Sequence, residues 1–374
     1  MTDQSSPTSP TGGNQAPAPD SRSDTPDGGV SARAVWFTGL RQAEVLDETV
    51  GEPAPGEVRV RSQTSLVSAG TELVLYRGET RSRAETDLPT SAGTYPFPIK
   101  FAYQVVGEVE AAGAESGFSV GQRVFAYHPH QSRFTIAGGA IGGGGLAPYG
   151  RRLLFAVPDE LSTEQAVFAN LYGVALTSLL DVPVRFGDCV AVSGLGIVGG
   201  FAAHLARATA GRLIVIDPLE SRRKQAAWIG ADAVIDPSDA AEVIRDLTDG
   251  RGVDVFIEAS GSERALQTAL ECTGKEGSVA VVAYYGAKPI SLVLSPEFHI
   301  QRLRVISVQN AMVGSGLQPR WDTTRRMGVV MEHLAKIDVS QLVTHRFGIE
   351  QAPEAYQLLD QHPDQALGVL LDYE

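Results

Sequence analysis

The sequence contains few cysteines, few basic residues and no long apolar run. Only Cys189 and Cys272 are present among 374 residues, so the chain can build neither a disulfide scaffold nor a four-cysteine zinc site, and the pair fits a reducing cytoplasm. Lysine and arginine number 31 against 44 aspartates and glutamates, a formal charge of −13, which argues against a nucleic-acid-binding surface. No run of about 20 apolar residues occurs, so no membrane span is expected.

The length and composition predict a polar N-terminal tail followed by two folded domains. The chain exceeds the roughly 250–300 residues at which one hydrophobic core stops growing, and its 43% hydrophobic and 20% charged content is typical of a soluble globular protein. The first thirty residues contain only Met1, Ala16, Ala18 and Val30 as apolar residues. We therefore predict a disordered tail over 1–31, with the alternative that it docks a partner.

Two different patterns follow the tail. Up to about residue 157 the sequence pattern predicts strands, because short apolar runs alternate with turn residues. The clearest runs are 34–38, 57–62, 105–111 and 123–127. The glycine-rich segment 137–150 indicates a mobile surface loop. After Pro158 the pattern of apolar residues changes from that of strands to that of a helix, and Ser162 is a plausible helix N-cap.

The second pattern alternates strands with helices. Short apolar strands are predicted at 189–193, 213–216, 233–235, 253–258 and 278–283, with helical stretches between them. This alternation predicts an α/β fold with a doubly wound parallel sheet. An amphipathic helix at 325–334 and a strand at 368–371 close the chain.

The strongest motif is a glycine-rich turn after the strand at 189–193. Gly194-Leu195-Gly196-Ile197-Val198-Gly199 follows an apolar strand and opens a helical run at 200–210. Such a turn brings backbone N–H groups and a helix N-terminus to a pyrophosphate. A glycine turn without a ligand is the alternative, but the strand, helix and later acidic residue together favour a dinucleotide site.

The identity of the dinucleotide depends on the end of the next strand. Asp217 lies 23 residues after Gly194, where a carboxylate would accept hydrogen bonds from the adenosine ribose and repel a 2′-phosphate. The sequence therefore predicts NAD, with NADP less favoured. Arg222 and Arg223 keep NADP as an alternative, because a guanidinium could bind its 2′-phosphate.

These segments resemble the medium-chain dehydrogenase/reductase superfamily, in its alcohol-dehydrogenase-like form. The likeness covers about residues 32–374 and is carried by 67–78, 107–109, 121–124, 194–199, 230–236 and 252–261. The resemblance implies a Rossmann domain at 171–310 inserted in a GroES-like β-rich catalytic domain at 32–170, which 311–374 completes. It also implies hydride transfer in the cleft between the domains and a homodimer or homotetramer.

The resemblance raises the question of zinc. Alcohol-dehydrogenase-like members hold a catalytic zinc with a Cys, a His and a second Cys, and these positions fall on Ala69, Tyr103 and near Ala169. The position of the relay histidine falls on Val74. Zinc sites need three or four Cys, His or carboxylate ligands, so we expect a branch that lacks the zinc ligands and binds no metal.

Without zinc, a side chain has to supply the proton that polarises the carbonyl. The candidates are Tyr103 and His128 as acid or base, Thr71 as a hydroxyl that relays a proton to the ribose, and Glu72 as an orienting carboxylate. The alternatives are plainer: Thr71 and Glu72 cap a helix after Gly70, and Tyr103 is a core residue.

His128 and His130 allow three interpretations. Two residues apart on an extended segment, they point to one face, which is compatible with metal binding, although Pro129 separates them and no third ligand is visible. They are otherwise surface or supporting histidines, or His128 lines the substrate pocket at the place where the superfamily has a pocket residue.

Three functions remain open. The first is an NAD-dependent oxidoreductase that interconverts a secondary alcohol and a ketone on a polyol-, cyclitol- or sugar-like molecule, in a biosynthetic step of secondary metabolism. The second is an NADPH-dependent enone or quinone reductase, and the third is a dinucleotide-binding protein without catalysis. In each case the partner is a small molecule, not nucleic acid or a membrane.

Overall fold

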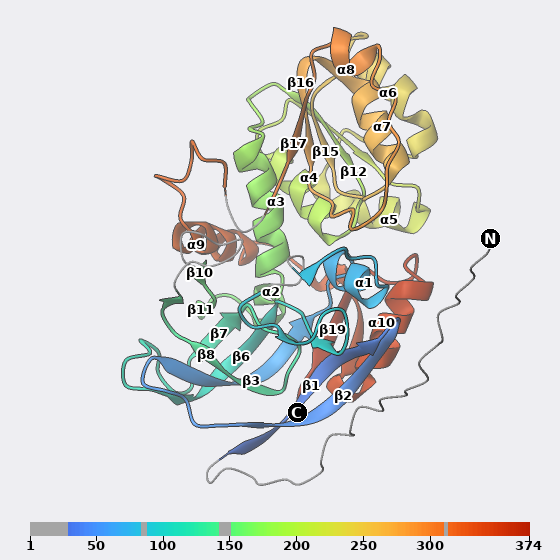
Figure 1. Ribbon diagram of the computed structural model, residues 1–374. Coiled ribbons are helices and arrows are strands. Elements are labelled where there is room, and N and C mark those ends of the chain that lie inside the picture. The colour runs from blue at the N-terminus through green and yellow to red at the C-terminus, as the bar shows by residue number, and fades with distance from the viewer. Residues whose placement is uncertain (1–28, 84–87, 142–150, 310–312) are drawn as a thin grey trace, which may run out of the picture.

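A computed structural model describes residues 29–83, 88–141, 151–309 and 313–374. Most of the predicted disordered tail, and residues 142–150 of the glycine-rich segment, lie outside these ranges. The chain forms a β-rich part and a part built on a parallel sheet, which stand one above the other in Figure 1.

The β-rich part contains two sheets. One has the order β2-β1-β5-β4 and the other β11-β7-β6-β3-β19-β18, with β8 also pairing with β3. The strands are β1 (Val30–Gly39), β2 (Gln42–Val50), β3 (Glu57–Leu66), β4 (Ala92–Gly93), β5 (Ile99–Lys100), β6 (Val105–Ala112), β7 (Arg123–Ala126), β8 (Arg133–Ala137), β11 (Leu154–Ala156), β18 (Val343–Gly348) and β19 (Gly368–Asp372). Strand β19 pairs antiparallel with β3, Leu370 opposite Leu66, so the end of the chain completes the sheet begun near its start.

The second part is the doubly wound sheet predicted from the sequence. Its strands run parallel in the order β14-β13-β12-β15-β16-β17. They are β12 (Cys189–Ser193), β13 (Arg212–Ile216), β14 (Ala233–Ile235), β15 (Val253–Glu258), β16 (Thr273–Val281) and β17 (Arg304–Ser307). The connecting helices are α4 (Ile197–Arg207), α5 (Glu220–Gln225), α6 (Ala240–Leu247), α7 (Glu263–Cys272) and α8 (Glu297–Ile300), with 3₁₀ turns at Ala226–Ile229 and Pro237–Asp239.

One hydrophobic core runs through both parts. It includes buried residues of β3, β6 and β7 and of β12 and β13. Between them lie α2 (Thr163–Ala166) and α3 (Ala169–Asp181), and Phe168 meets Phe201 of α4 with ring centroids 5.9 Å apart. Because helices on a sheet bury its apolar face, α3 and α4 cover one face of the parallel sheet while α6 and α7 cover the other.

The remaining elements lie at the rims. They are α1 (Thr71–Tyr76), α9 (Thr323–Leu334), α10 (Ala352–Gln361), the strand pair β9 (Ala140–Ile141) and β10 (Arg151–Arg152), and the 3₁₀ turns Ser340–Leu342 and Ile349–Gln351. Helix α1 lies at the top of the β-rich part, facing the parallel sheet (Figure 1). Among the described residues, no helix is both long and apolar enough to cross a membrane.

Local sequence signals located most boundaries correctly. Ser162 caps α2 with the reciprocal hydrogen bonds of a capping box to Gln165, as predicted. The helix predicted at 200–210 begins earlier, at Ile197, because Gly196 is its N-cap and the later motif residues form its first turn. The loop predicted at 137–150 is wrong at its start: residues 140–141 are a strand paired with 151–152.

Candidate active site

The glycine-rich turn connects β12 to α4. Gly194 has a φ of 93°, and a Cβ there would lie 2.7 Å from the backbone nitrogen of Ser260. A Cβ on Gly199 would lie 1.8 Å from the Gly194 carbonyl oxygen. Both positions therefore require glycine, one for its backbone angle and the other for the contact between helix and strand.

The open side of this turn fits a dinucleotide pyrophosphate. A Cβ on Gly196 would meet nothing within 4 Å, and the first-turn N–H groups of α4 have no partner within their helix. Strand β12 has β13 on one side and β15 on the other, which is where the order of winding reverses. Open α/β sheets bind ligands at the carboxyl ends of the strands at such a point.

Asp217 ties the end of β13 to the glycine-rich turn. Its side chain is buried, with Oδ2 accepting from the Leu195 N–H at 2.7 Å and Oδ1 accepting from the Leu219 N–H at 2.8 Å. Each carboxylate oxygen has a second lone pair. The carboxylate is thus held in a fixed orientation beside the turn and keeps acceptor capacity.

The two arginines that left NADP open both have protein partners. Arg222 donates to the carbonyls of Pro363 (3.1 Å) and Ala366, in the segment before β19. Burial lowers the pKa of its guanidinium, and the charge of nearby Asp217 opposes this. Arg223 donates to the Asp217 carbonyl at 2.6 Å and to Oδ2 of Asp236 at 2.9 Å.

Glu258, which the sequence analysis did not single out, supports the same turn. The carboxylate is fully buried at the end of β15. It accepts from the N–H and hydroxyl of Ser260 at 2.7 and 2.5 Å and from the Tyr285 hydroxyl at 2.8 Å. Because Ser260 packs against Gly194, these hydrogen bonds hold in place the segment on which the turn rests. An acidic residue that ends a buried strand, as Asp217 does, was the available signal.

Tyr103 lies in the β-rich part, between β5 and β6. Its hydroxyl donates to Oγ of Ser68 at 2.6 Å, just before α1. Burial raises the pKa of Tyr103 to about 12; the charge of Glu72 adds to this, and the hydroxyls of Ser68 and Thr71 oppose it. The structure thus brings two of the candidate residues, Tyr103 and Thr71, together and adds Ser68.

Glu72 is fully buried and forms its hydrogen bonds away from the backbone of α1. Its Oε2 accepts from the Tyr356 hydroxyl of α10 at 2.7 Å and from Nε2 of His130 at 3.1 Å. Its Oε1 is buried and has no hydrogen-bond partner among the described residues. The capping alternative is not what the structure shows: Gly70 is the N-cap of α1, and no side chain caps the helix.

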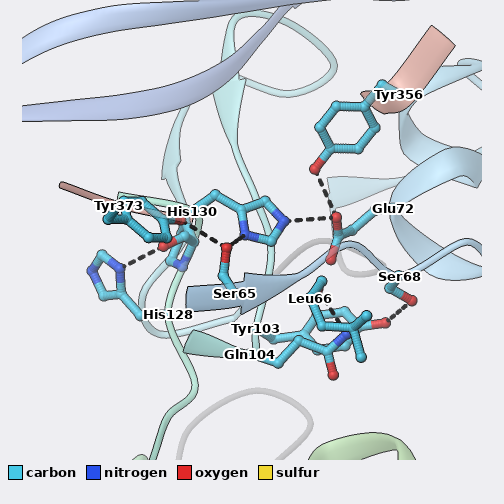
Figure 2. Close-up of polar contacts among 11 residues, drawn as sticks. Ser65, Leu66, Ser68, Glu72, Tyr103, Gln104, His128, His130, Tyr356 and Tyr373 are labelled. Carbon is cyan, nitrogen blue, oxygen red and sulfur yellow. Dashed lines mark hydrogen bonds and ion pairs between the residues drawn. The ribbon is translucent and has the colours of Figure 1, made fainter. Parts of the chain in front are cut away.

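His128 and His130 have different surroundings, and neither lies at the surface. The Nδ1–H of His128 donates to the Pro129 carbonyl at 3.0 Å, and its ring stacks on Phe134 at 3.8 Å. Burial lowers the pKa of His128 to about 3, so its ring is neutral at physiological pH. His130, not His128, contacts Glu72 (Figure 2), and the i, i+2 spacing alone did not indicate which histidine would do so.

The chain is similar to known dehydrogenases. A family model described as zinc-binding dehydrogenase matches residues 197–328. D-guloside 3-dehydrogenase of Shigella flexneri is 29% identical over 331 residues, which are 83% of this chain and 91% of that protein. L-threonine 3-dehydrogenase of Pyrococcus abyssi is 27% identical over 341 residues, 85% and 92% of the two chains.

The matched family model and these relatives support the resemblance to the medium-chain dehydrogenase/reductase superfamily. The expected class, an NAD(P)-dependent dehydrogenase of CH–OH groups, is confirmed by these relatives.

Solved structures confirm the expected fold. The 2R,3R-butanediol dehydrogenase of Bacillus subtilis superposes with a TM-score of 0.72 at 19% identity, covering 91% of this chain and 99% of that one. Two further neighbours, from Sinorhizobium meliloti and Escherichia coli, were solved with NADP and NADH respectively, with TM-scores of 0.71 and 0.70. A GroES-like part with an inserted Rossmann part is therefore the architecture of this chain.

The name of the matched family model includes zinc, and the side chains described here do not provide a zinc site. The resemblance places the three ligand positions at Ala69, at Tyr103 and near Ala169, and of these three residues only Tyr103 has a polar side chain. Within the described ranges, no three His, Cys, Asp or Glu side chains are grouped so as to hold a metal ion. These residues do not fit a catalytic zinc, which needs at least three protein ligands.

Proposed function

We propose that this protein is a zinc-independent, NAD-dependent oxidoreductase that interconverts a secondary alcohol and a ketone. The observation that carries the proposal is the group formed by Tyr103, Ser68 and Thr71. In it a half-buried phenol stands at the position that the resemblance assigns to a zinc-binding histidine. A proton donor at that place performs the task of a metal, because both stabilise the negative charge that develops on the carbonyl oxygen.

A nicotinamide cofactor, when bound at the glycine-rich turn, would supply the hydride for the carbonyl carbon. Tyr103 gives its phenolic proton to the carbonyl oxygen, which produces the alcohol. The hydroxyls of Ser68 and Thr71 align that phenol and stabilise the phenolate as it forms. His128 stays neutral and contributes to the wall of the site, while Glu72 acts through its charge on Tyr103.

The preference for NAD rests on Asp217 and on the engagement of the two arginines. A fixed carboxylate at the end of β13 favours the ribose hydroxyls over a 2′-phosphate, and Arg222 and Arg223 donate to protein acceptors. Gly194, Leu195, Gly196, Ile197, Val198 and Gly199 would hold the pyrophosphate, and Arg222 would steady the ribose side through its position near Asp217.

The proposed substrate is a polyol-, cyclitol- or sugar-like molecule. The relatives' names support a substrate with several polar groups, since they specify a guloside and threonine. We also propose a cytoplasmic enzyme whose domains divide at the predicted boundaries of 32–170 with 311–374 and 171–310. A homodimer or homotetramer is supported by the outer strand β17, where Val305 is 45% exposed, and by nearby Ile300, 70% exposed.

The test is a paired titration of the purified protein with NADH and NADPH, combined with metal analysis and turnover on sorbitol, butane-2,3-diol and a D-guloside. We expect tighter NADH binding, less than about a tenth of a zinc per chain, and oxidation of at least one alcohol. Asp217→Asn should reduce the preference for NADH. Asp254→Asn is the matched control, since Asp254 on strand β15 of the same sheet also accepts from a backbone N–H, that of Cys189. Tighter NADPH binding with reduction of an enone would replace this proposal by the enone or quinone reductase, and one zinc per chain would overturn the mechanism.

A further inference from the structure

A continuous chain of hydrogen bonds leads from Glu72 to the end of the polypeptide. Nε2 of His130 donates to Glu72 at 3.1 Å, Nδ1 of His130 lies 2.7 Å from Oγ of Ser65, and that oxygen lies 2.7 Å from the Tyr373 hydroxyl. Figure 2 shows these side chains in one row. Each of these four groups can pass on a proton, because imidazole, hydroxyl and carboxyl groups both donate and accept.

The inner end of this row is buried, whereas its outer end approaches solvent. Glu72 and Ser65 are 0% exposed and His130 is 1% exposed. Tyr373 is partly exposed and is followed by the exposed Glu374. The row therefore leads from a sealed interior, through β3, to a partly exposed residue that follows β19.

The unpartnered oxygen of Glu72 lies at the inner end of the row. Leaving a buried acceptor without a hydrogen bond costs about 1–3 kcal/mol, and buried waters usually satisfy such groups. Figure 2 shows Glu72 between His130 and the Tyr103–Ser68 pair, and its charge acts on the phenol of Tyr103. One water on Oε1 would join the row to this pair.

We propose that Tyr373, Ser65, His130 and Glu72 form a buried proton relay that returns a proton to Tyr103 after each ketone reduction. The inference rests on the proposed function of Tyr103. When Tyr103 has given its proton to the substrate, the Glu72 carboxylate takes a proton from Nε2 of His130, whose Nδ1 takes one from Ser65. A water on Oε1 would then carry the proton from Glu72 to the phenolate, which leaves Glu72 a carboxylate again. Ser65 is reprotonated by Tyr373, and Tyr373 by solvent.

The relay is tested without substrate by the exchange of the His130 ring N–H with water. The signal is measured by magnetisation transfer from water in ¹⁵N-histidine-labelled protein and assigned by its loss in His130→Gln. A relay carries protons along the row, so Tyr373→Phe should slow this exchange about tenfold, because proton transfer loses one of its hydroxyl steps. If Tyr373 has a purely structural role, Tyr373→Phe should instead speed the exchange of the His130 ring N–H, since removing a hydrogen bond loosens the region.

Tyr356→Phe is the matched control. It also removes a tyrosine hydroxyl, one that donates to the same Glu72 oxygen, but it lies outside the row. We expect exchange in this variant to be no slower than in the unmodified protein. Unchanged or faster exchange in Tyr373→Phe overturns the relay, as does equal slowing in both variants.

A second measurement separates the relay from the reaction. Stopped-flow reduction of acetoin and D-fructose by NADH is followed by NADH absorbance and by a pH-indicator dye, and Tyr373→Phe should delay proton uptake relative to hydride transfer. If neither ketone is reduced but exchange slows, the proposed reaction fails and the relay stands. If a ketone is reduced and exchange does not slow, the reaction stands and the relay is wrong.

Discussion

The two halves of the candidate site are built in different ways. The cofactor turn is local: Gly194, Gly196 and Gly199 lie within six residues, and the Asp217 carboxylate accepts from the backbone N–H groups of Leu219 and of Leu195, 22 residues away. The proton-donor half is assembled from distant segments. Glu72 lies 58 residues from His130 and 284 residues from Tyr356. A local motif specifies its own geometry, whereas the second half depends on the completed fold.

The two halves also differ in their partners. The carboxylates of the cofactor half, Asp217 and Glu258, accept mainly from backbone N–H groups and hydroxyls close in sequence. Glu72 accepts only from side chains, of His130 and Tyr356. Single substitutions should therefore remove the partners of Glu72 and leave those of Asp217 largely intact, and this difference can be measured.

The largest effect is expected for Tyr103→Phe. Loss of the acidic group should slow ketone reduction by about 10²–10⁴-fold, with NADH affinity unchanged because the cofactor half is untouched. Tyr285→Phe, which removes a hydroxyl bonded to Glu258, is the matched control in the other half. Equal rates for Tyr103→Phe and the unmodified enzyme would eliminate Tyr103 as the acid.

The pH dependence of the unmodified enzyme follows from the same residue. Burial raises the pKa of Tyr103 to about 12, and the protonated phenol is the donor. The rate of ketone reduction at saturating substrate should therefore show no loss attributable to this group from about pH 7 to about pH 10. It should fall only as the pH approaches the raised value, and a fall centred near neutral pH would identify another acid.

The next largest effect is expected for His130→Ala. This change leaves a buried carboxylate with one donor fewer, which should lower the free energy of unfolding by about 3 kcal/mol. Urea unfolding at neutral pH measures the loss. In a Glu72→Gln background the same change should cost distinctly less, since no buried charge remains. Equal costs in both backgrounds would mean that His130 acts through packing alone.

The cofactor half and the proton-donor half also differ in how well the sequence predicts them. The turn at 194–199, the acidic residue at 217 and the strands around them are specified by neighbours in sequence, so the pattern was sufficient to predict them. Strand β2 was not predicted, because most of its side chains are exposed and its apolar pattern is weak.

The proton-donor half could be predicted only in part. Thr71, Glu72 and Tyr103 were identified through their positions in the superfamily's motifs. Whether His130 or His128 contacts Glu72 depends on which of the two rings faces α1. Tyr356 and Tyr373 reach the site only because α10 and β19 pack against α1 and β3. Such contacts carry no signal in the local sequence.

A smaller effect distinguishes two glycines of the cofactor half. Gly199→Ala places a methyl group 1.8 Å from the Gly194 carbonyl, so the backbone must shift, and we expect a loss of about 1–3 kcal/mol in stability. Gly196→Ala meets no atom within 4 Å and should leave stability unchanged. It should still weaken NADH binding, since the methyl group fills the space proposed for the pyrophosphate. Equal stability losses would contradict the geometry of this turn.

The last effect concerns His128 and is expected only in acid. Burial lowers its pKa to about 3, with smaller contributions of the same sign from Lys100 and His130. The unfolded chain, with an ordinary histidine pKa near 6.5, binds a proton that the folded state does not. The stability contributed by the depressed pKa is therefore present above about pH 6.5 and is lost as the pH falls toward 3, by up to about 1.4 kcal/mol per pH unit. Urea unfolding at several pH values below 6.5 should show a shallower loss for His128→Gln than for the exposed control His362→Gln. If the two variants lose stability equally, His128 is not held neutral by its surroundings, and the contrast drawn between it and His130 fails.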